Sequence, residues 1–113
     1  MKALIPVFLL VLTLTGFKPN DQQNQFCRLY GVVYVEESRA FADHLVFEMD
    51  TEAFADLVVF DEENRLFADR SGIWHFTDNR DFADFTIYFT ESRDQADFSI
   101  YFTETASFAG CRD

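Results

Sequence analysis

The sequence has little positive charge and few of the residues that mark phosphate-binding motifs. Its 113 residues include 9 Lys and Arg against 20 Asp and Glu, which gives a formal net charge of −11 at pH 7. A field of this sign repels nucleic-acid backbones and anionic lipid surfaces. We therefore expect no nucleic-acid partner, and no membrane partner once the signal peptide inferred below is removed. The 4 glycines do not form a glycine-rich phosphate loop.

Candidate catalytic groups are equally scarce. His44 and His75 are the only histidines. Acidic pairs such as Glu36–Glu37 alternate with polar turn segments, so they do not form a separated pair of carboxylates in distinct environments. No arrangement of nucleophile, base and oxyanion donors can be assembled from this composition. We therefore expect no enzymatic activity, no catalytic residues and no cofactor.

Long hydrophobic runs are absent except at the start of the chain. The run from Ala3 to Thr15, after Lys2, is too short for a membrane span and has the size of the hydrophobic region of a secretory signal peptide. A retained anchor is the alternative. We expect a cleaved signal peptide at residues 1–16, a polar linker at residues 17–26 and one domain at residues 27–113, in a secreted, periplasmic or extracellular protein.

Cysteine is limited to Cys27 and Cys111, one at each end of the expected domain. In an oxidising compartment, one intramolecular disulfide between them is the expected pairing. It would close a loop of about 84 residues and stabilise the fold by about 4 to 5 kcal/mol in the chain-entropy model. An intermolecular bridge and two reduced thiols are the alternatives.

A seven-residue phrase recurs along most of the chain. It consists of an acidic residue, then Ser, Thr or Asn, then usually Arg, any residue, Phe, Ala and Asp. The repeated Ala lies at intervals of 13, 13, 15, 13 and 13 residues, at Ala42, Ala55, Ala68, Ala83, Ala96 and Ala109. The repeated Asp follows it at Asp43, Asp56, Asp69, Asp84 and Asp97. A unit this short cannot bury a core alone, so the sequence predicts one domain of tandem repeats.

Each Ala-Asp is followed by a run of β-branched and aromatic residues, which predicts strands at residues 44–47, 57–60, 85–89 and 98–102. One aligned column is Val33, Val46, Val59, Trp74, Ile87 and Ile100, and the next is Tyr34, Phe47, Phe60, His75, Tyr88 and Tyr101. Neighbouring columns point to opposite faces, so we expect strands that are covered on both sides. The fold class is therefore all-β, and the periodicity by itself favours a compact β-solenoid.

The two extra residues of the third interval lie near Arg70–Gly72. An even insertion keeps every later side chain on its original face, whereas an odd insertion would turn the core outward. The sequence therefore predicts that Ile87 and Ile100 face the same side as Val33.

The other repeated positions have structural interpretations. The Ser, Thr and Asn residues suit tight turns, because their side chains bond to nearby backbone groups; they are Ser38, Thr51, Asn64, Asn79, Ser92 and Thr105. The repeated Ala is expected where two chain segments cross too closely for a larger residue. The Phe before it, replaced only at Gln95, is expected in the core.

The repeated Asp allows two interpretations. Regularly spaced carboxylates could bind a row of calcium ions outside the cell. Arg residues four positions earlier could instead pair with the carboxylates without a metal; they are Arg39, Arg65, Arg80 and Arg93. Because neither known calcium-binding pattern is present, we favour the interpretation without a metal.

The phrases at residues 82–89 and 95–102 resemble the Ala-Asp-x-x-Val-Tyr repeats of the septoil knot family. The resemblance covers about residues 27–113, and it departs from the pattern at Leu29–Tyr30, at the insertion and at Ala109–Gly110. It implies a small all-β domain whose chain is tied in a seven-crossing torus knot. It implies no activity and no binding residue.

We therefore expect a secreted, non-enzymatic structural or interaction domain. One alternative is a binding module for a glycan or a peptide that uses exposed aromatic residues among Tyr30, Tyr34, Tyr88, Tyr101 and Trp74. A calcium-binding repeat protein is another. A protein or glycan partner and homo-oligomerisation both remain open.

Overall fold

The computed structural model describes residues 25–111, which form short strands joined by 3-10 turns. The strands are β1 (Gly31–Val35), β2 (His44–Glu48), β3 (Leu57–Asp61), β4 (Ile73–Phe76), β5 (Phe85–Phe89), β6 (Phe98–Thr103) and β7 (Gly110–Cys111). The turns are η1 (Gln25–Arg28), η2 (Arg39–Phe41), η3 (Glu52–Phe54), η4 (Arg65–Phe67), η5 (Arg80–Phe82), η6 (Arg93–Gln95) and η7 (Ala106–Phe108). The expected all-β class and the four expected strands are confirmed. The signal peptide expected at residues 1–16 lies outside the described residues, and η1 begins within the expected linker.

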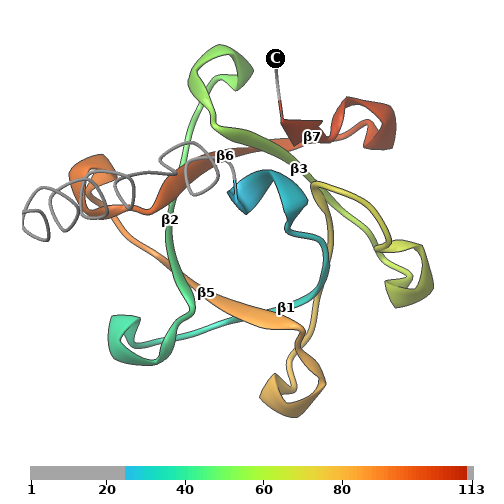
Figure 1. Ribbon diagram of the computed structural model, residues 1–113, viewed down its shortest axis with the longest axis horizontal. Helices are drawn as coiled ribbons and strands as arrows, with labels where there is room; N and C mark the ends of the chain where they lie inside the picture. The colour runs from blue at the N-terminus through green and yellow to red at the C-terminus, as the bar shows by residue number, and fades with distance from the viewer. Residues whose placement is uncertain (1–24, 112–113) are drawn as a thin grey trace, which may run out of the picture.

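Strands β1 to β6 form a closed parallel barrel. Their order is β4-β1-β5-β2-β6-β3, and β3 also pairs with β4. β7 pairs antiparallel with the first residues of β3, whereas β4 pairs with the last residues of β3, so β7 takes a seventh place between them. In this ring, each strand lies two places beyond the previous strand of the chain. The chain therefore winds twice around the barrel axis (Figure 1).

The β-solenoid favoured by the periodicity is wrong. A solenoid pairs consecutive repeats, whereas β1 pairs with β4 and β5, and β2 pairs with β5 and β6. Apart from β3 and β4, which are consecutive, the strands that pair in this barrel belong to repeats three or four units apart in the sequence.

The first aligned column of side chains fills the barrel. Val33, Val46, Val59, Trp74, Ile87 and Ile100 are all 0% exposed. Ile87 and Ile100 follow the two-residue insertion, so the prediction that it preserves the inward face is confirmed. The second column lies on the outer face of the strands and is half-buried. Of the two faces that we expected to be covered, only the inner face is therefore fully buried.

The 3-10 turns η2 to η7 project from the barrel as six arms (Figure 1). The expected turn-forming role of the Ser, Thr and Asn residues is confirmed at Ser38, Asn64 and Asn79, whose side chains accept a backbone N–H two residues later. The repeated Ala ends each arm, and its N–H donates to the carbonyl three residues earlier. Ala55 and Ala68 are buried, whereas the other repeated alanines are half-buried.

The prediction that the repeated Phe belongs to the core is wrong. The exposed fractions are 62% for Phe41, 66% for Phe54, 60% for Phe67, 61% for Phe82 and 61% for Phe108. Each of these residues is the last of a three-residue turn. The turn leaves the barrel and returns within so few residues that its outer side chain cannot reach the interior.

The irregular third interval is where both ends of the domain meet the barrel. The Ser71 hydroxyl donates to the Cys27 carbonyl, and the Gly72 N–H donates to the Leu29 carbonyl at 3.1 Å. Gly72 has φ +79°, and a Cβ there would overlap the backbone of Gly110. The insertion therefore gives room for the start of the domain and for β7 at one seam.

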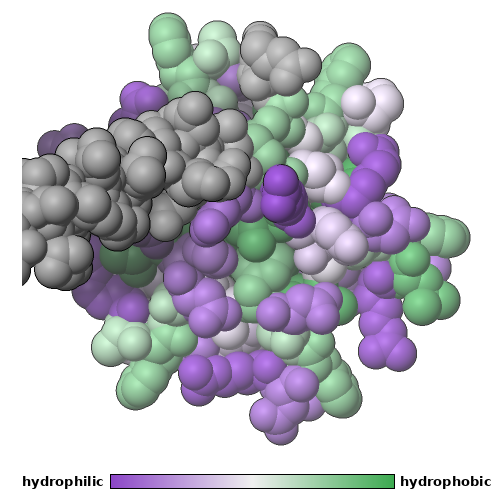
Figure 2. All heavy atoms as spheres, viewed as in Figure 1, coloured by the Kyte–Doolittle hydropathy of each residue, from purple (hydrophilic) through white to green (hydrophobic). Residues whose placement is uncertain are grey.

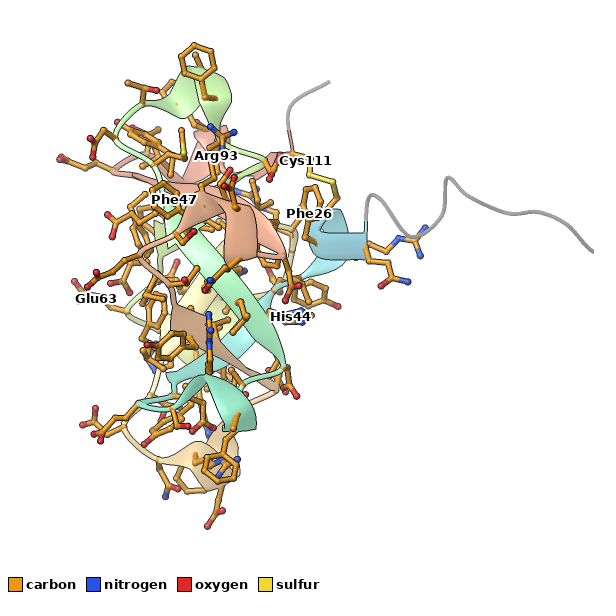
Figure 3. The ribbon with its side chains drawn as sticks, turned by 90° about the vertical axis from the view of Figure 1, so that its left-hand side faces the viewer. Phe26, His44, Phe47, Glu63, Arg93 and Cys111 are labelled. Carbon is orange, nitrogen blue, oxygen red and sulfur yellow. A yellow bond between two sulfur atoms is a disulfide. The ribbon has the colours of Figure 1, made fainter. Side chains whose placement is uncertain are left out.

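The expected intramolecular disulfide joins Cys27 to Cys111, with 5.4 Å between their Cα atoms. It lies with η1 and Phe26 at one end of the barrel (Figure 3). Among the described residues, no helix has the length and apolar character needed to cross a membrane.

Candidate functional site

Four of the repeated Asp residues act as latches between repeats. The Asp84 N–H donates to the Val32 carbonyl at 2.7 Å, and the Asp84 carboxylate accepts the Val32 N–H at 2.8 Å. The same reciprocal pair of bonds joins Asp97 to Leu45, Asp43 to Thr86 and Asp56 to Ser99. Each carboxylate thus replaces the carbonyl that a longer neighbouring strand would have offered.

The latch also accounts for the departure from the repeat at the end of the domain. Gly110 stands at the sixth position of the repeated Asp, and it pairs with Val58 in the short strand β7 instead. Within residues 25–111, no group of three or more His, Cys, Asp or Glu side chains is arranged to hold a metal ion. The repeated Asp therefore has a role in holding the barrel closed.

Three of the four repeated Arg residues contact neighbouring arms, while the latch carboxylates are held by backbone amides. The Arg39 guanidinium on η2 donates to the Gln95 side chain on η6 at 2.6 Å, and Arg93 on η6 donates to the Phe54 carbonyl on η3 at 3.4 Å. Arg80 on η5 lies over the Phe41 ring, 5.7 Å from its centroid. It also lies 3.0 Å from the carboxylate of the buried Glu36. These contacts tie η5, η2, η6 and η3 together in that order.

The aromatic residues considered as binding residues have different positions. Trp74 is completely buried, and its indole N–H donates to the Leu29 carbonyl at 3.0 Å. Tyr34, Tyr88 and Tyr101 are half-buried on the outer face of their strands, and Tyr30 is exposed. Trp74 is therefore a core residue, and the three strand tyrosines present only part of their rings.

The most exposed aromatic surface is the set of Phe side chains on the arms. Groups of hydrophobic side chains stand around the rim of the molecule, where Figure 1 draws the arms, and polar side chains lie between them (Figure 2). Leu66, next to Phe67 on η4, is 73% exposed, so η4 presents two apolar side chains. Gln95 replaces Phe on η6 and receives the bond from Arg39.

A cleft of about 800 Å³ lies beside η4 and is lined by Phe60, Phe67, Ala106 of η7 and His75, with a row of acidic residues. The acidic residues are Asp61, Glu62 and Glu63, and Asn64 and Arg65 also line the cleft. The His75 Nδ1 lies 2.8 Å from the Glu62 carbonyl, which orients its ring against the cleft. The cleft therefore combines two Phe rings with a net negative charge, because Arg65 offsets only one of the three carboxylates.

The second histidine is held in the opposite part of the barrel. His44 lies edge-on to Phe85 and Phe98, with centroid distances of 5.9 and 5.7 Å. Phe98 also stacks on Phe26 of η1 at 5.1 Å. His44 thus belongs to the aromatic packing at the end of the barrel where the strands begin (Figure 3).

The family model of the 7(1) septoil knot domain matches residues 26–112. The chain belongs to the septoil knot family. A path that winds twice around an axis in seven steps describes a seven-crossing torus knot, which agrees with the strand order of this barrel. Comparisons with curated proteins and with solved structures each found no match.

As a septoil knot domain, the chain presents a surface that sequence reasoning misplaced. The repeated Phe, which the sequence analysis expects in the core, lies on the surface of the arms. The signal that could have placed it outside is its context, since it lies two residues after Arg39, Arg65 and Arg80 in three of the copies. A large apolar residue within a short polar turn has few neighbours to bury it.

Proposed function

We propose that this septoil knot domain is an extracellular, non-enzymatic interaction module whose arms bind a protein partner. The observation that carries the proposal is the 60 to 66% exposure of the Phe side chain on five arms. Large apolar side chains are normally buried, and exposed apolar patches on soluble proteins often mark interaction sites.

The contacts between arms favour binding over chance exposure. Arg80 covers one face of Phe41, and Arg93 holds the backbone of Phe54. A side chain that is fixed before binding loses less conformational entropy when a partner covers it. The closed barrel and the disulfide also lower the entropy lost on binding, because they limit the movement of the arms relative to one another.

The cleft beside η4 indicates the chemistry of the partner. It is lined by Phe60 and Phe67, and by the three carboxylates of Asp61, Glu62 and Glu63 with one cation, Arg65. A protein segment that places an apolar side chain beside Lys or Arg would satisfy both features. Phe lacks the polar group with which Tyr and Trp bind sugars, and Trp74 is buried, so a protein partner is favoured over a glycan.

The extracellular location is supported by the Cys27–Cys111 disulfide, since such bonds persist mainly in oxidising compartments. The signal peptide proposed at residues 1–16 agrees with it. The non-enzymatic role is supported by the structural use of the repeated polar residues, because four of the repeated Asp residues hold strand amides.

Peptide display tests the proposal. A random peptide library is selected on the oxidised protein and counter-selected on a Phe67→Ser, Phe108→Ser variant. We expect enriched peptides that combine apolar and basic residues, with affinity reduced about tenfold or more by Phe67→Ser, as is typical when an aromatic anchor is truncated. Glu63→Gln should reduce affinity for the same peptides by a smaller factor, more strongly at low salt.

Phe41→Ser is the matched control, because Phe41 is equally exposed on an arm that does not line this cleft. Its affinity for the selected peptides should equal that of the wild type. Failure to enrich any peptide over the counter-selected variant would contradict the proposal, as would equal binding to the Phe67→Ser variant.

A further inference from the structure

The two ends of the barrel are built differently. At the end where the strands begin, η1 packs Phe26 against Phe98, and Leu29 and Cys111 also pack against the core. At the end where the strands finish, a cavity of about 530 Å³ lies over the last inward-facing residues. One end is therefore plugged by the chain itself, and the other is open to solvent.

The residues at the open end come from equivalent positions of the repeats, two after the buried column. Around the ring they are Phe76, Val35, Phe89, Glu48, Phe102 and Asp61. Aromatic rings thus come from β4, β5 and β6, while β2 and β3 supply carboxylates between them. The three Phe residues are half-buried against the core, whereas Val35, Glu48 and Asp61 are exposed at the same opening.

The three rings form an apolar floor. Phe102 lies 6.0 Å from Phe76 and 6.4 Å from Phe89, with interplanar angles of 58° and 53°. All three are half-buried and pack against the buried core, so their inner faces are fixed while part of each ring lines the cavity. The π face of a Phe ring is electron-rich, so rings that line a cavity can contact a guest favourably.

The rim of the cavity is acidic. Glu48, Asp61 and Asp78 line it and are exposed, and the lining residues of the described chain include no Lys or Arg. The net charge of −11 strengthens the negative potential at this opening. The cavity therefore attracts a cation at its edge and offers apolar, polarisable surface beneath it.

We propose that the open end of the barrel binds a small organic cation of the alkylammonium class, with a quaternary ammonium group over the Phe floor. Such a group carries its charge on methyl groups, so it contacts aromatic faces with little desolvation and needs no hydrogen-bond acceptor in the floor. The carboxylates at the rim balance its charge at longer range. A metal ion would need oxygen ligands where the floor has rings, and a neutral apolar guest would gain nothing from the rim.

Choline and its neutral carbon analogue 3,3-dimethylbutan-1-ol provide a matched pair of probes, because they share a shape and differ in charge. Each is titrated into the oxidised full chain and followed by calorimetry and by backbone amide NMR shifts. We expect choline to bind with a millimolar or lower Kd, and the alcohol about tenfold more weakly or not at all. The largest shifts should lie at Phe76, Phe89 and Phe102.

Two variants separate the two halves of the site. Glu48→Gln combined with Asp78→Asn removes rim charge without changing shape, and it should weaken choline binding several-fold while leaving the alcohol unaffected. Phe102→Leu removes the ring that contacts both others and should weaken choline binding about tenfold. Asp94→Asn on η6 and Phe108→Leu on η7 are the matched controls, since neither residue lines the cavity.

Equal affinity for choline and for the alcohol would overturn the proposal, and so would NMR shifts confined to the arms. Choline binding that survives both variants would overturn it as well. If Phe102→Leu does not fold, as judged by the fluorescence of Trp74, the rim variant decides the question, because its two side chains are exposed. Asp61 borders this cavity and the cleft beside η4, so it is left unchanged in order to keep the two sites distinguishable.

Discussion

Replacing Cys27 and Cys111 by Ser should lower stability and also slow the refolding of chains that have had time to untie. The disulfide spans 84 residues of sequence. In the chain-entropy model a loop of this length stabilises the fold by about 4 to 5 kcal/mol. With a guanidinium m-value of about 3 kcal/mol/M, the unfolding midpoint of the Cys27→Ser, Cys111→Ser variant should fall by about 1.5 M.

The kinetic effect follows from the closed loop between the cysteines. While the disulfide is intact, denaturant cannot release crossings that were made before the bond formed, so the unfolded chain stays knotted. Without the bond, the chain unties during the time it spends unfolded, and refolding then requires threading in addition to the slow pairing of distant strands. We expect the refolding of the variant to slow by about an order of magnitude or more as the unfolding delay increases.

The assay is a double-jump experiment with Trp74 fluorescence as the signal, since Trp74 is completely buried in the native state. Ile87→Ala, with the disulfide intact, is the matched control. It should lose about 2 to 5 kcal/mol through a core cavity. Its refolding rate should not depend on the delay.

A refolding rate of the double Ser variant that stays constant from short to long delays would refute the reasoning. The same conclusion would follow if Ile87→Ala showed a delay dependence of equal size. A midpoint shift below about 0.3 M would refute the stability estimate separately, because it corresponds to about 1 kcal/mol.

Three other changes test the structural roles of single residues. Asp97→Ala removes the acceptor of the Leu45 N–H and should lower the free energy of unfolding in urea by about 1 to 2 kcal/mol. Asp69 has the equivalent repeat position, but its side chain makes no hydrogen bond within residues 25–111. Asp69→Ala should therefore change the free energy of unfolding by less than about 0.5 kcal/mol. Gly72→Ala should cost more than about 2 kcal/mol, because the new Cβ meets backbone atoms and φ is positive; a melting temperature within about 2 °C of the wild type would show that the seam can adjust. Calcium at about 5 mM, which exceeds the Kd of about 1 mM typical of the weakest extracellular sites, should leave the melting temperature unchanged; a rise of several degrees that Asp84→Asn abolishes would establish the calcium site instead.

The strands and the inward column could be predicted from the sequence because two periods agree. Alternation within each strand determines which side chains, such as those of Val46 and Ile100, point into the barrel. The 13-residue interval repeats the same pattern in the next unit. The even insertion could be interpreted for the same reason. The turn-forming role of Asn64 and Asn79 is a local property, which a sequence reveals directly.

The pairing of the strands could not be predicted in this way. Repeats of one sequence are nearly interchangeable, so nothing local determines that β1 pairs with β4 and β5. The choice depends on ring closure, and resemblance to a family supplied what periodicity could not. The latch hydrogen bonds could not be predicted for the same reason. Asp84 and Val32 are 52 residues apart, and in the sequence they have the character of an ordinary turn residue and an ordinary strand residue.

The place of Phe67 and its equivalents was missed for a physical reason. Their apolar character does not show whether the side chain points into the barrel or into solvent. The shortness of the projecting turn decides this, because the turn is too short to return the side chain to the interior. The cavity at the open end was missed because Glu48, Asp61, Phe89 and Phe102 share one repeat position in the sequence but surround one opening only when the repeats are placed around a ring.

The seam between the two ends of the domain also determines how the molecule would bear a mechanical load. Cys27 and Cys111 lie 5.4 Å apart at their Cα atoms and are covalently joined. Tension applied to the chain on either side of this pair passes through one sulfur–sulfur bond and bypasses the barrel. A tethered domain of this kind neither lengthens nor tightens its knot when pulled, until a reductant transfers the load to the strands.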